Sequence, residues 1–164
     1  MVHFAEYASP VGKLLLTSDG ENLTGLYMGR ELPEQDSDIP VFREAKEWLD
    51  AYFRGEVRRI GFPLAPEGTA FQKKVWDILL TIPYGGTRTY GDIAREMADF
   101  LGRERMSAQA VGQAVGKNPI SILIPCHRVV GAKGQLTGYA GGLDKKQWLL
   151  RHEGWVKEEE YDCQ

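Results

Sequence analysis

The sequence predicts an α/β (α+β) protein of two domains, a small domain with a short antiparallel sheet followed by a mainly helical one. Three short β-type segments open the chain, helix-start signals dominate after a Pro- and Gly-containing stretch at 63–68, and the charge changes sign between the halves. Residues 69–157 carry 13 Lys and Arg against 7 Asp and Glu, whereas the rest carries 7 against 16. We therefore expect an acidic structural domain over 1–65, a basic working domain over 69–157 and an acidic tail over 158–164.

The first domain begins with three predicted strands, at 2–8, 11–18 and 22–29. Turn residues at 9–12 and 19–22 separate them, so an antiparallel meander is the simplest pairing.

A helix is predicted after the polar stretch 31–38. Its apolar residues fall on one helical stripe, namely Val41, Phe42, Ala45, Trp48, Leu49, Tyr52 and Phe53. Asp38 and Pro40 are expected to open this helix and Gly55 to stop it. Residues 60–68 read as a last strand and a linker.

Three helix starts are expected in the second domain. Thr69 with Gln72 and Thr89 with Asp92 have the spacing of a capping box, and Ser107 can cap a helix over 108–116. A polar connector from Asp99 to Met106 separates the last two helices. Two short helices in succession fit a helix-turn-helix, although a helical hairpin fits the pattern too.

Cys126 lies in the pentapeptide Pro125-Cys126-His127-Arg128-Val129, which follows the apolar run 120–124. We expect that run to be a buried strand that ends in a proline-locked turn. A thiol is a useful nucleophile only as thiolate, so a reactive cysteine needs a base or a positive charge within reach, and His127 is adjacent. A buried structural cysteine beside a structural histidine is the alternative.

Composition limits the other classes of function. Two cysteines, Cys126 and Cys163, cannot build a disulfide framework or a Cys-rich zinc site. The first domain contains no cysteine and only one histidine, His3, which is too few soft ligands for a tetrahedral zinc site. We expect no metal and no membrane segment, and the reduced cytoplasm is the default location.

Several spaced motifs together resemble one family. Asn118-Pro119, the pentapeptide around Cys126, Gly138-Tyr139-Ala140-Gly141-Gly142 and the segment 146–154 occur in the order typical of O6-alkylguanine-DNA alkyltransferases. The resemblance covers about Phe71 to Gly154. It implies a winged helix-turn-helix domain and a single-turnover repair protein. It also implies double-stranded DNA carrying O6-alkylguanine as the partner, no cofactor, no obligate protein partner and a monomer.

The resemblance also implies roles for five catalytic residues. Cys126 would be the alkyl acceptor, His127 would take the thiol proton through a water, and Glu153 would orient the imidazole. Tyr90 would donate to the purine as the nucleotide turns out of the duplex, and Asn118 would form the hinge before the active-site segment.

Further residues match the substrate pocket and the DNA-binding surface of that family. The pocket residues are Tyr90, Gln109, Arg128, Gly138, Tyr139, Ala140 and Gly141. The DNA-binding residues are Arg103, Arg105, Ser107, Ala108, Gln109, Ala110, Gly112, Gln113 and Lys117.

The chain departs from the family pattern at three places. Gln109 stands where an arginine normally enters the base stack, and glutamine lacks the planar cation that stacks on bases and attracts phosphate. Ala140 replaces a common hydroxyl residue, and the Asp99–Met106 connector, with Arg103 and Arg105, is longer than usual.

Three other classes stay open at this point. A non-catalytic lesion sensor would lack the acceptor cysteine, and a helix-turn-helix regulator would not need the Pro-Cys-His-Arg set. The presence of Cys126 argues against the sensor, and a regulator with weak transfer activity stays an alternative, given Gln109. A cysteine hydrolase would turn over repeatedly, whereas a thioether is inert.

Overall fold

The computed structural model describes residues 2–33, 36–139 and 141–155, and it divides into two compact units. Unit 1 comprises residues 1–68 together with 119–123, and unit 2 comprises 69–118 together with 124–164. The short segment 119–123, which the sequence places in the second domain, thus belongs to unit 1. No helix in the described part of the chain is long and apolar enough to cross a membrane.

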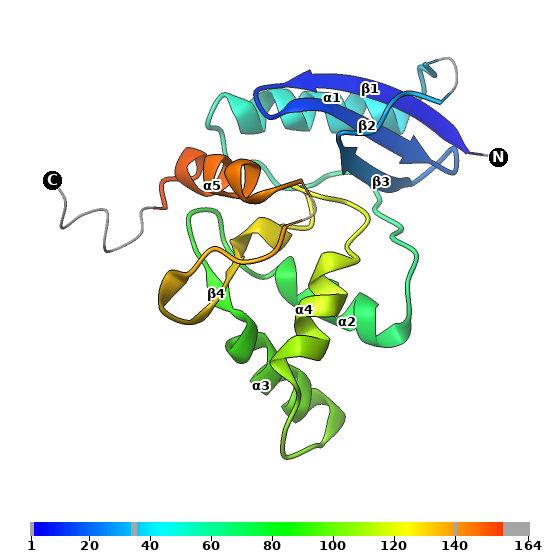
Figure 1. The fold of residues 1–164 in the computed structure, drawn as a ribbon. Helices are drawn as coiled ribbons and strands as arrows, with labels where there is room; N and C mark the ends of the chain where they lie inside the picture. Colours follow the sequence, from blue (N-terminus) through cyan, green and yellow to red (C-terminus); the bar gives the residue numbers. More distant parts are fainter. Residues whose placement is uncertain (1, 34–35, 140, 156–164) are drawn as a thin grey trace, which may run out of the picture. The chain divides into compact units, whose positions relative to one another are not determined.

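Unit 1 contains the predicted antiparallel meander, with strands β1 (His3–Ser9), β2 (Gly12–Ser18) and β3 (Leu23–Met28) in that spatial order (Figure 1). Ala5 pairs with Leu16, which pairs with Leu26, so these three lie on one face. Tyr7 shares that face, and its hydroxyl donates to Asp50 of the following helix at 2.6 Å. That helix therefore covers one face of the sheet.

The covering helix is α1 (Pro40–Phe53), and its predicted stripe is largely buried. Pro40 occupies the first turn, where its missing N–H has no intrahelical partner to lose. Gly55, with φ of 87°, follows the helix end as expected. The prediction that Asp38 opens α1 is wrong: Ile39 is the N-cap, and Asp38 instead accepts a hydrogen bond from Arg43 at 3.0 Å.

Residues 60–68 do not form the predicted strand. They are reduced to a single β-bridge between Leu23 and Leu64, flanked by the bonds from Leu23 N to Pro63 O and from Ala65 N to Leu23 O, each 2.9 Å. Pro63 and Pro66 have no N–H to donate, so the pairing cannot extend into a ladder.

The apolar run 120–124 is buried as predicted but is not a strand. Only Ile120 bridges to Leu26, and the chain then turns at Ile122, whose φ is 71°. A left-handed conformation is unfavourable for a β-branched residue and is held by its surroundings. Here Leu123 N donates to Ser121 O at 2.8 Å. A continuous apolar run indicates burial but not which backbone conformation achieves it.

Unit 2 is built mainly of four α-helices, α2 (Ala70–Leu79), α3 (Tyr90–Leu101), α4 (Ala108–Gly116) and α5 (Leu143–His152). Both predicted capping boxes form, and the Ser107 hydroxyl accepts from Ala110 N at 3.2 Å. Buried Trp76 joins α2 to α4 by donating to Ala114 O at 2.9 Å.

The predicted connector between α3 and α4 begins later than expected. Residues 99–101 are still helical, and Gly102, with φ of 67°, ends α3. A glycine in the left-handed conformation is the usual helix stop, whereas Asp99 and Phe100 can continue a helix. Exposed Arg103 and Arg105 therefore lie in a short connector rather than in a long loop.

Short elements complete unit 2 around the cysteine. Strand β4 (Arg88–Thr89) pairs in parallel with β5 (Val129–Val130), and the 3₁₀ helices η1 (Cys126–Arg128) and η2 (Ala132–Gly134) flank β5. Because β4 runs directly into α3, this pairing brings the start of α3 close to the segment that follows Cys126.

Candidate active site

Cys126 is the first residue of η1 and its side chain is buried, with 7% of its surface exposed. Two tight turns hold it: Cys126 N donates to Ile124 O at 2.8 Å, and Arg128 N donates to Pro125 O at 3.0 Å. Helices α2 and α5 both contact η1. The thiol therefore has a fixed position inside unit 2.

The surroundings of the thiol act on its pKa in opposite directions. Burial raises the pKa of Cys126, while the nearby polar side chains of Asn118 and Tyr139 and the positive charge of Lys146 lower it. The Asn118 amide also donates to Ile124 O at 2.8 Å, which fixes its position. The balance keeps Cys126 protonated at rest, so a reaction at the sulfur needs a group that removes its proton.

His127 and Glu153 form a fully enclosed pair. The His127 Nε2 lies 2.6 Å from Glu153 Oε2, and neither side chain is exposed. Burial lowers the pKa of His127, although Glu153 opposes the shift. Burial alone would raise the pKa of Glu153, but the hydrogen bonds and charges of His127 and Arg128 outweigh it and bring that pKa to about 2.

The pKa shifts of Glu153 and His127 determine which imidazole nitrogen carries the proton. Glu153 is ionised at neutral pH and can only accept, so His127 must carry its proton on Nε2 and donate it. The Nδ1 atom is then an unprotonated acceptor, and it is buried without a hydrogen-bond partner among the described residues. The pair thus presents a base at Nδ1.

Arg128 holds the carboxylate from the other side. Its guanidinium donates to both oxygens of Glu153, at 2.7 Å and 3.1 Å, and to Ile82 O at 2.7 Å. The structure therefore places Arg128, which the sequence assigns to the substrate pocket, against Glu153. A bidentate guanidinium fixes both the charge and the orientation of a carboxylate.

Lys146 is a site residue that the sequence reading missed. Its side chain is completely buried, its Nζ donates to Thr137 O at 2.8 Å, and its charge acts on Cys126. Tyr90 donates to the same carbonyl at 3.2 Å, so one backbone oxygen joins α3 and α5. The available signal was a lysine on the apolar stripe of α5, with Leu149 and Leu150.

Lys146→Met is expected to slow reaction at Cys126 about tenfold, because one pKa unit of thiolate stabilisation corresponds to a tenfold change in its population. Burial lowers the pKa of Lys146 to about 8, so its charge helps the thiolate below pH 8 and is lost above it. A rate against pH profile should show this falling limb in the parent chain and lack it in the variant. An unchanged profile would remove Lys146 from the site.

The lowered pKa of Lys146 also predicts how its contribution to the free energy of unfolding changes with pH. The unfolded chain binds a proton at this lysine up to about pH 10.5, whereas the folded chain releases it near 8. The contribution of Lys146 to stability therefore rises between pH 8 and 10.5, and Lys146→Met should not show this rise in thermal melts.

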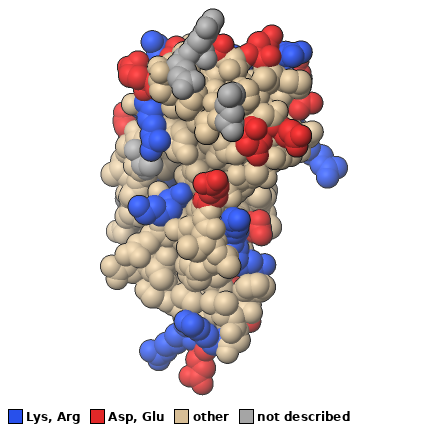
Figure 2. All heavy atoms as spheres, turned by 90° about the vertical axis from the view of Figure 1, so that its right-hand side faces the viewer, with Lys and Arg blue, Asp and Glu red and all other residues tan. Residues whose placement is uncertain are grey.

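The exposed surface of α4 is made of small and uncharged side chains. Ser107, Ala108, Gln109 and Gln113 are exposed, Ala110 is half-buried, and Lys117 is exposed just after the helix. Gly112 instead faces Tyr90, because a Cβ there would lie 3.8 Å from the tyrosine ring. Figure 2 shows Lys and Arg side chains at the lower end of the drawn face together with an acidic side chain, and Figure 1 places the α3–α4 connector at that end of unit 2.

The predicted pocket loop is only partly described. Gly138 has a φ of 46°, and the Tyr139 side chain acts on the pKa of Cys126. Gly141 is half-buried, and Ala140 lies outside the described residues. No group of three or more His, Cys, Asp or Glu within residues 2–33, 36–139 and 141–155 is placed to hold a metal ion.

Family profiles match both halves of the chain. The 6-O-methylguanine DNA methyltransferase DNA-binding domain matches residues 70–155, and the ribonuclease-like domain of the same family matches residues 2–66. A methylated-DNA--protein-cysteine methyltransferase of Methanosarcina acetivorans is 47% identical over 161 residues, which cover 93% of this chain and 99% of that protein. The protein of that name from Mycobacterium leprae is 46% identical and covers 93% of each chain.

Solved structures agree with these relatives. The crystal structure of Mycobacterium tuberculosis O6-methylguanine methyltransferase has a TM-score of 0.79 at 46% identity and covers 93% of each chain. The Mycobacterium tuberculosis protein in complex with DNA also has a TM-score of 0.79, at 45% identity and 92% coverage of each chain. The profiles, relatives and structures extend over both units, and the chain therefore belongs to the 6-O-methylguanine DNA methyltransferase family.

Proposed function

We propose that this chain repairs DNA by moving an alkyl group from O6 of guanine to the sulfur of Cys126, once per molecule. The bond from sulfur to the alkyl carbon forms as the bond from that carbon to O6 breaks, and the thiol proton ends on the restored guanine. A buried thiol beside a histidine with an unprotonated Nδ1 carries this proposal. The test is whether one methyl group, and no more, moves from damaged DNA to each chain.

Proton removal falls to His127. Nδ1 makes no hydrogen bond to the described residues, so a single bridging water could pass the thiol proton to it, as the family resemblance implies. Glu153 would stabilise the imidazolium that forms, and Arg128 would keep Glu153 ionised and correctly turned. Arg128 is then a positioning residue.

Tyr90 would stabilise guanine as it leaves the alkyl group. It lies at the start of α3, close enough to Cys126 for the two groups to interact electrostatically. Burial raises the pKa of Tyr90, so its phenol keeps its proton, and it would move its hydrogen bond from Thr137 O to the purine when the base enters. Asn118 and Tyr139, whose side chains lower the pKa of the thiol, and the glycines 138 and 141 would line the space for the extruded base.

The DNA would lie along the exposed residues of α4. Small side chains at 107, 108 and 110 permit close approach of the backbone, while Gln109 and Gln113 can hydrogen-bond base edges. Arg103, Arg105 and Lys117 would contact phosphates, which makes binding weaken as salt is added.

Gln109→Arg is expected to speed transfer from duplex DNA about tenfold and to leave transfer from single-stranded DNA unchanged. A guanidinium can stack in the space left by the extruded nucleotide, and only a duplex requires that space to be filled. Single-turnover rates on both substrates test this, with Gln113→Arg, one turn further along α4, as the matched control. Equal changes on both substrates would exclude position 109 from extrusion.

Alkylation of Cys126 is expected to destabilise the chain by about 1–3 kcal/mol, because an added carbon overpacks a buried site. For a chain of this size each kcal/mol lowers the melting temperature by roughly 2–4 °C. Melts of free and methylated protein measure the shift. A methylated form that melts at the same or a higher temperature would contradict it.

The proposal also places the chain in the cytoplasm as a monomer. Reducing conditions there keep Cys126 as a thiol, and an acceptor that reacts once requires no second subunit.

A further inference from the structure

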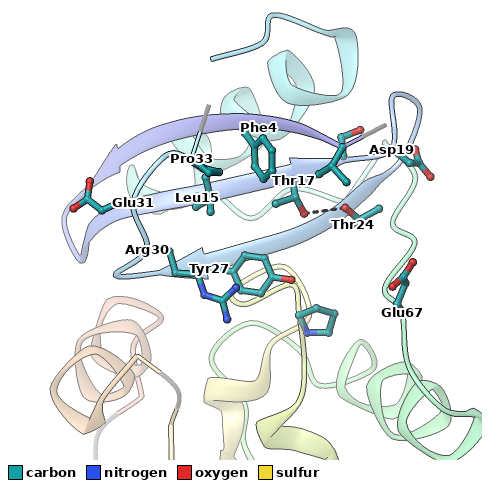
Figure 3. A pocket seen from close by; sticks show the side chains of 13 residues that line it. Phe4, Leu15, Thr17, Asp19, Thr24, Tyr27, Arg30, Glu31, Pro33 and Glu67 are labelled. Carbon is teal, nitrogen blue, oxygen red and sulfur yellow. Dashed lines mark hydrogen bonds between the residues drawn. The ribbon is translucent and has the colours of Figure 1, made fainter. Parts of the chain in front are cut away.

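The sheet of unit 1 carries a pocket on the face that α1 leaves uncovered. Its volume is about 650 Å³, within the range of small-molecule sites in proteins (Figure 3). All of its lining residues belong to unit 1, and none takes part in the alkyl transfer proposed above.

The floor of the pocket is apolar and well ordered by strand pairing. Phe4 pairs with Thr17 and Leu15 pairs with Tyr27, so the four side chains share one face of the sheet. Leu15 and Thr17 are buried, with 5% and 9% exposed. The Thr17 hydroxyl lies 2.8 Å from that of Thr24, and each oxygen keeps a lone pair that can accept a further hydrogen bond.

Carboxylates stand at the two ends of this floor. Figure 3 shows Glu31 at one end and Asp19 and Glu67 towards the other, with Phe4, Leu15 and Thr17 between them. Asp19 accepts from the backbone N–H groups of Glu21 and Asn22 and from the Asn22 amide, at 2.8 to 3.0 Å, so its charge is fixed in place.

Among the described residues, Arg30 is the one cation that lines the pocket, and its guanidinium already stacks on an aromatic ring. The Arg30 guanidinium lies 4.0 Å from the centre of the Tyr27 ring. The net charge of the lining is therefore negative, and an anionic ligand is excluded. The carboxylates are spread across the floor rather than clustered around one point, which also disfavours a single metal ion.

We propose that this pocket binds a linear aliphatic polyamine. Ammonium groups at the two ends of such a molecule would meet Glu31 at one side and Asp19 or Glu67 at the other. The methylene chain between them would cover Phe4 and Leu15, in the way that a lysine stem lies on apolar surface. The Thr17 and Thr24 hydroxyls can accept from an internal amine.

Removing a carboxylate and removing the arginine should change polyamine affinity in opposite directions, and this difference tests the site. Spermidine is titrated into the full chain by calorimetry, and one molecule should bind per chain. Glu31→Gln and Glu67→Gln should each weaken binding about two- to five-fold, as expected for exposed ion pairs. Arg30→Gln should strengthen binding by a similar factor, because it removes the one opposing charge. Glu47→Gln, an exposed change on α1, is the matched control and should bind as the parent does.

Three results would overturn the proposal: no heat with millimolar spermidine, equal affinity in the parent and both glutamine variants, or equal binding of Mg²⁺ and spermidine at matched ionic strength. The last would show only attraction of cations to an acidic surface. Methyl transfer should keep its parent rate in Glu31→Gln and Glu67→Gln, so failure of the polyamine site and failure of the repair function are separate outcomes.

Discussion

Cys126→Ala is expected to abolish alkyl transfer completely while the protein still folds and binds DNA. No other described cysteine is present to take the alkyl group, and a methyl side chain cannot attack carbon. Alanine fills most of the space of a buried cysteine, so the cost in stability should be about 1 kcal/mol. Transfer of label from O6-methylguanine DNA and a circular dichroism melt measure the two effects.

The DNA affinity of Cys126→Ala separates chemistry from binding. Gel-shift titrations should give a dissociation constant for damaged duplex within about threefold of the parent value, since the thiol is buried and the residues of α4 that we propose to contact DNA are exposed. Cys126→Ser gives a second inactive protein of nearly the same shape. Measurable methyl transfer in either variant would contradict the assignment of the nucleophile.

Glu153→Gln is expected to slow transfer by roughly 10³- to 10⁴-fold, the effect of neutralising the carboxylate that orients a catalytic imidazole. A glutamine amide can hydrogen-bond His127, but it lacks the charge that stabilises the imidazolium, and because it can donate as well as accept it does not select the Nε2–H tautomer. Single-turnover rates on duplex DNA measure the loss. Glu96→Gln, which removes an exposed carboxylate paired with Arg88, is the matched control and should leave the rate unchanged.

The same variant should lose stability in a pH-dependent way. The pKa of Glu153 is lowered to about 2 in the folded chain, so its ionised form adds stability above about pH 4.5 and that stability is lost as pH falls towards 2. Melting temperatures of parent and Glu153→Gln should therefore differ most at neutral pH and converge in acid. A constant difference across that range would show that Glu153 is not paired as described.

Local signals in the sequence predicted most helices and strands. The capping residues Thr69, Thr89 and Ser107 lie at the helix starts that they predict, because each satisfies backbone N–H groups three residues away. Asp38 failed as a cap because its carboxylate pairs with Arg43 instead.

The predicted strands at 60–68 and 120–124 do not form because of local backbone constraints. Both runs are apolar in the sequence, yet prolines limit the first to one bridge and Ile122 turns the second. An apolar residue contributes to a core whether its backbone is extended or turned, so composition cannot distinguish the two.

The site shows a similar division between local and long-range information. The pentapeptide containing Cys126 and His127 was visible in the sequence, as was Glu153 through the family resemblance. The hydrogen bonds from Arg128 to Glu153 and the position of Lys146 near the thiol depend on contacts between η1 and α5. No local sequence pattern specifies those contacts.

Mass spectrometry of the reacted protein shows whether Cys126 is the alkyl acceptor. Duplex DNA with one O6-methylguanine is incubated with excess protein, and the intact chain and its peptides are weighed. We expect one added methyl group per DNA lesion, located on Cys126, with unmodified guanine restored in the DNA. A methyl group on another residue, or repaired DNA with no methylated protein, would contradict it.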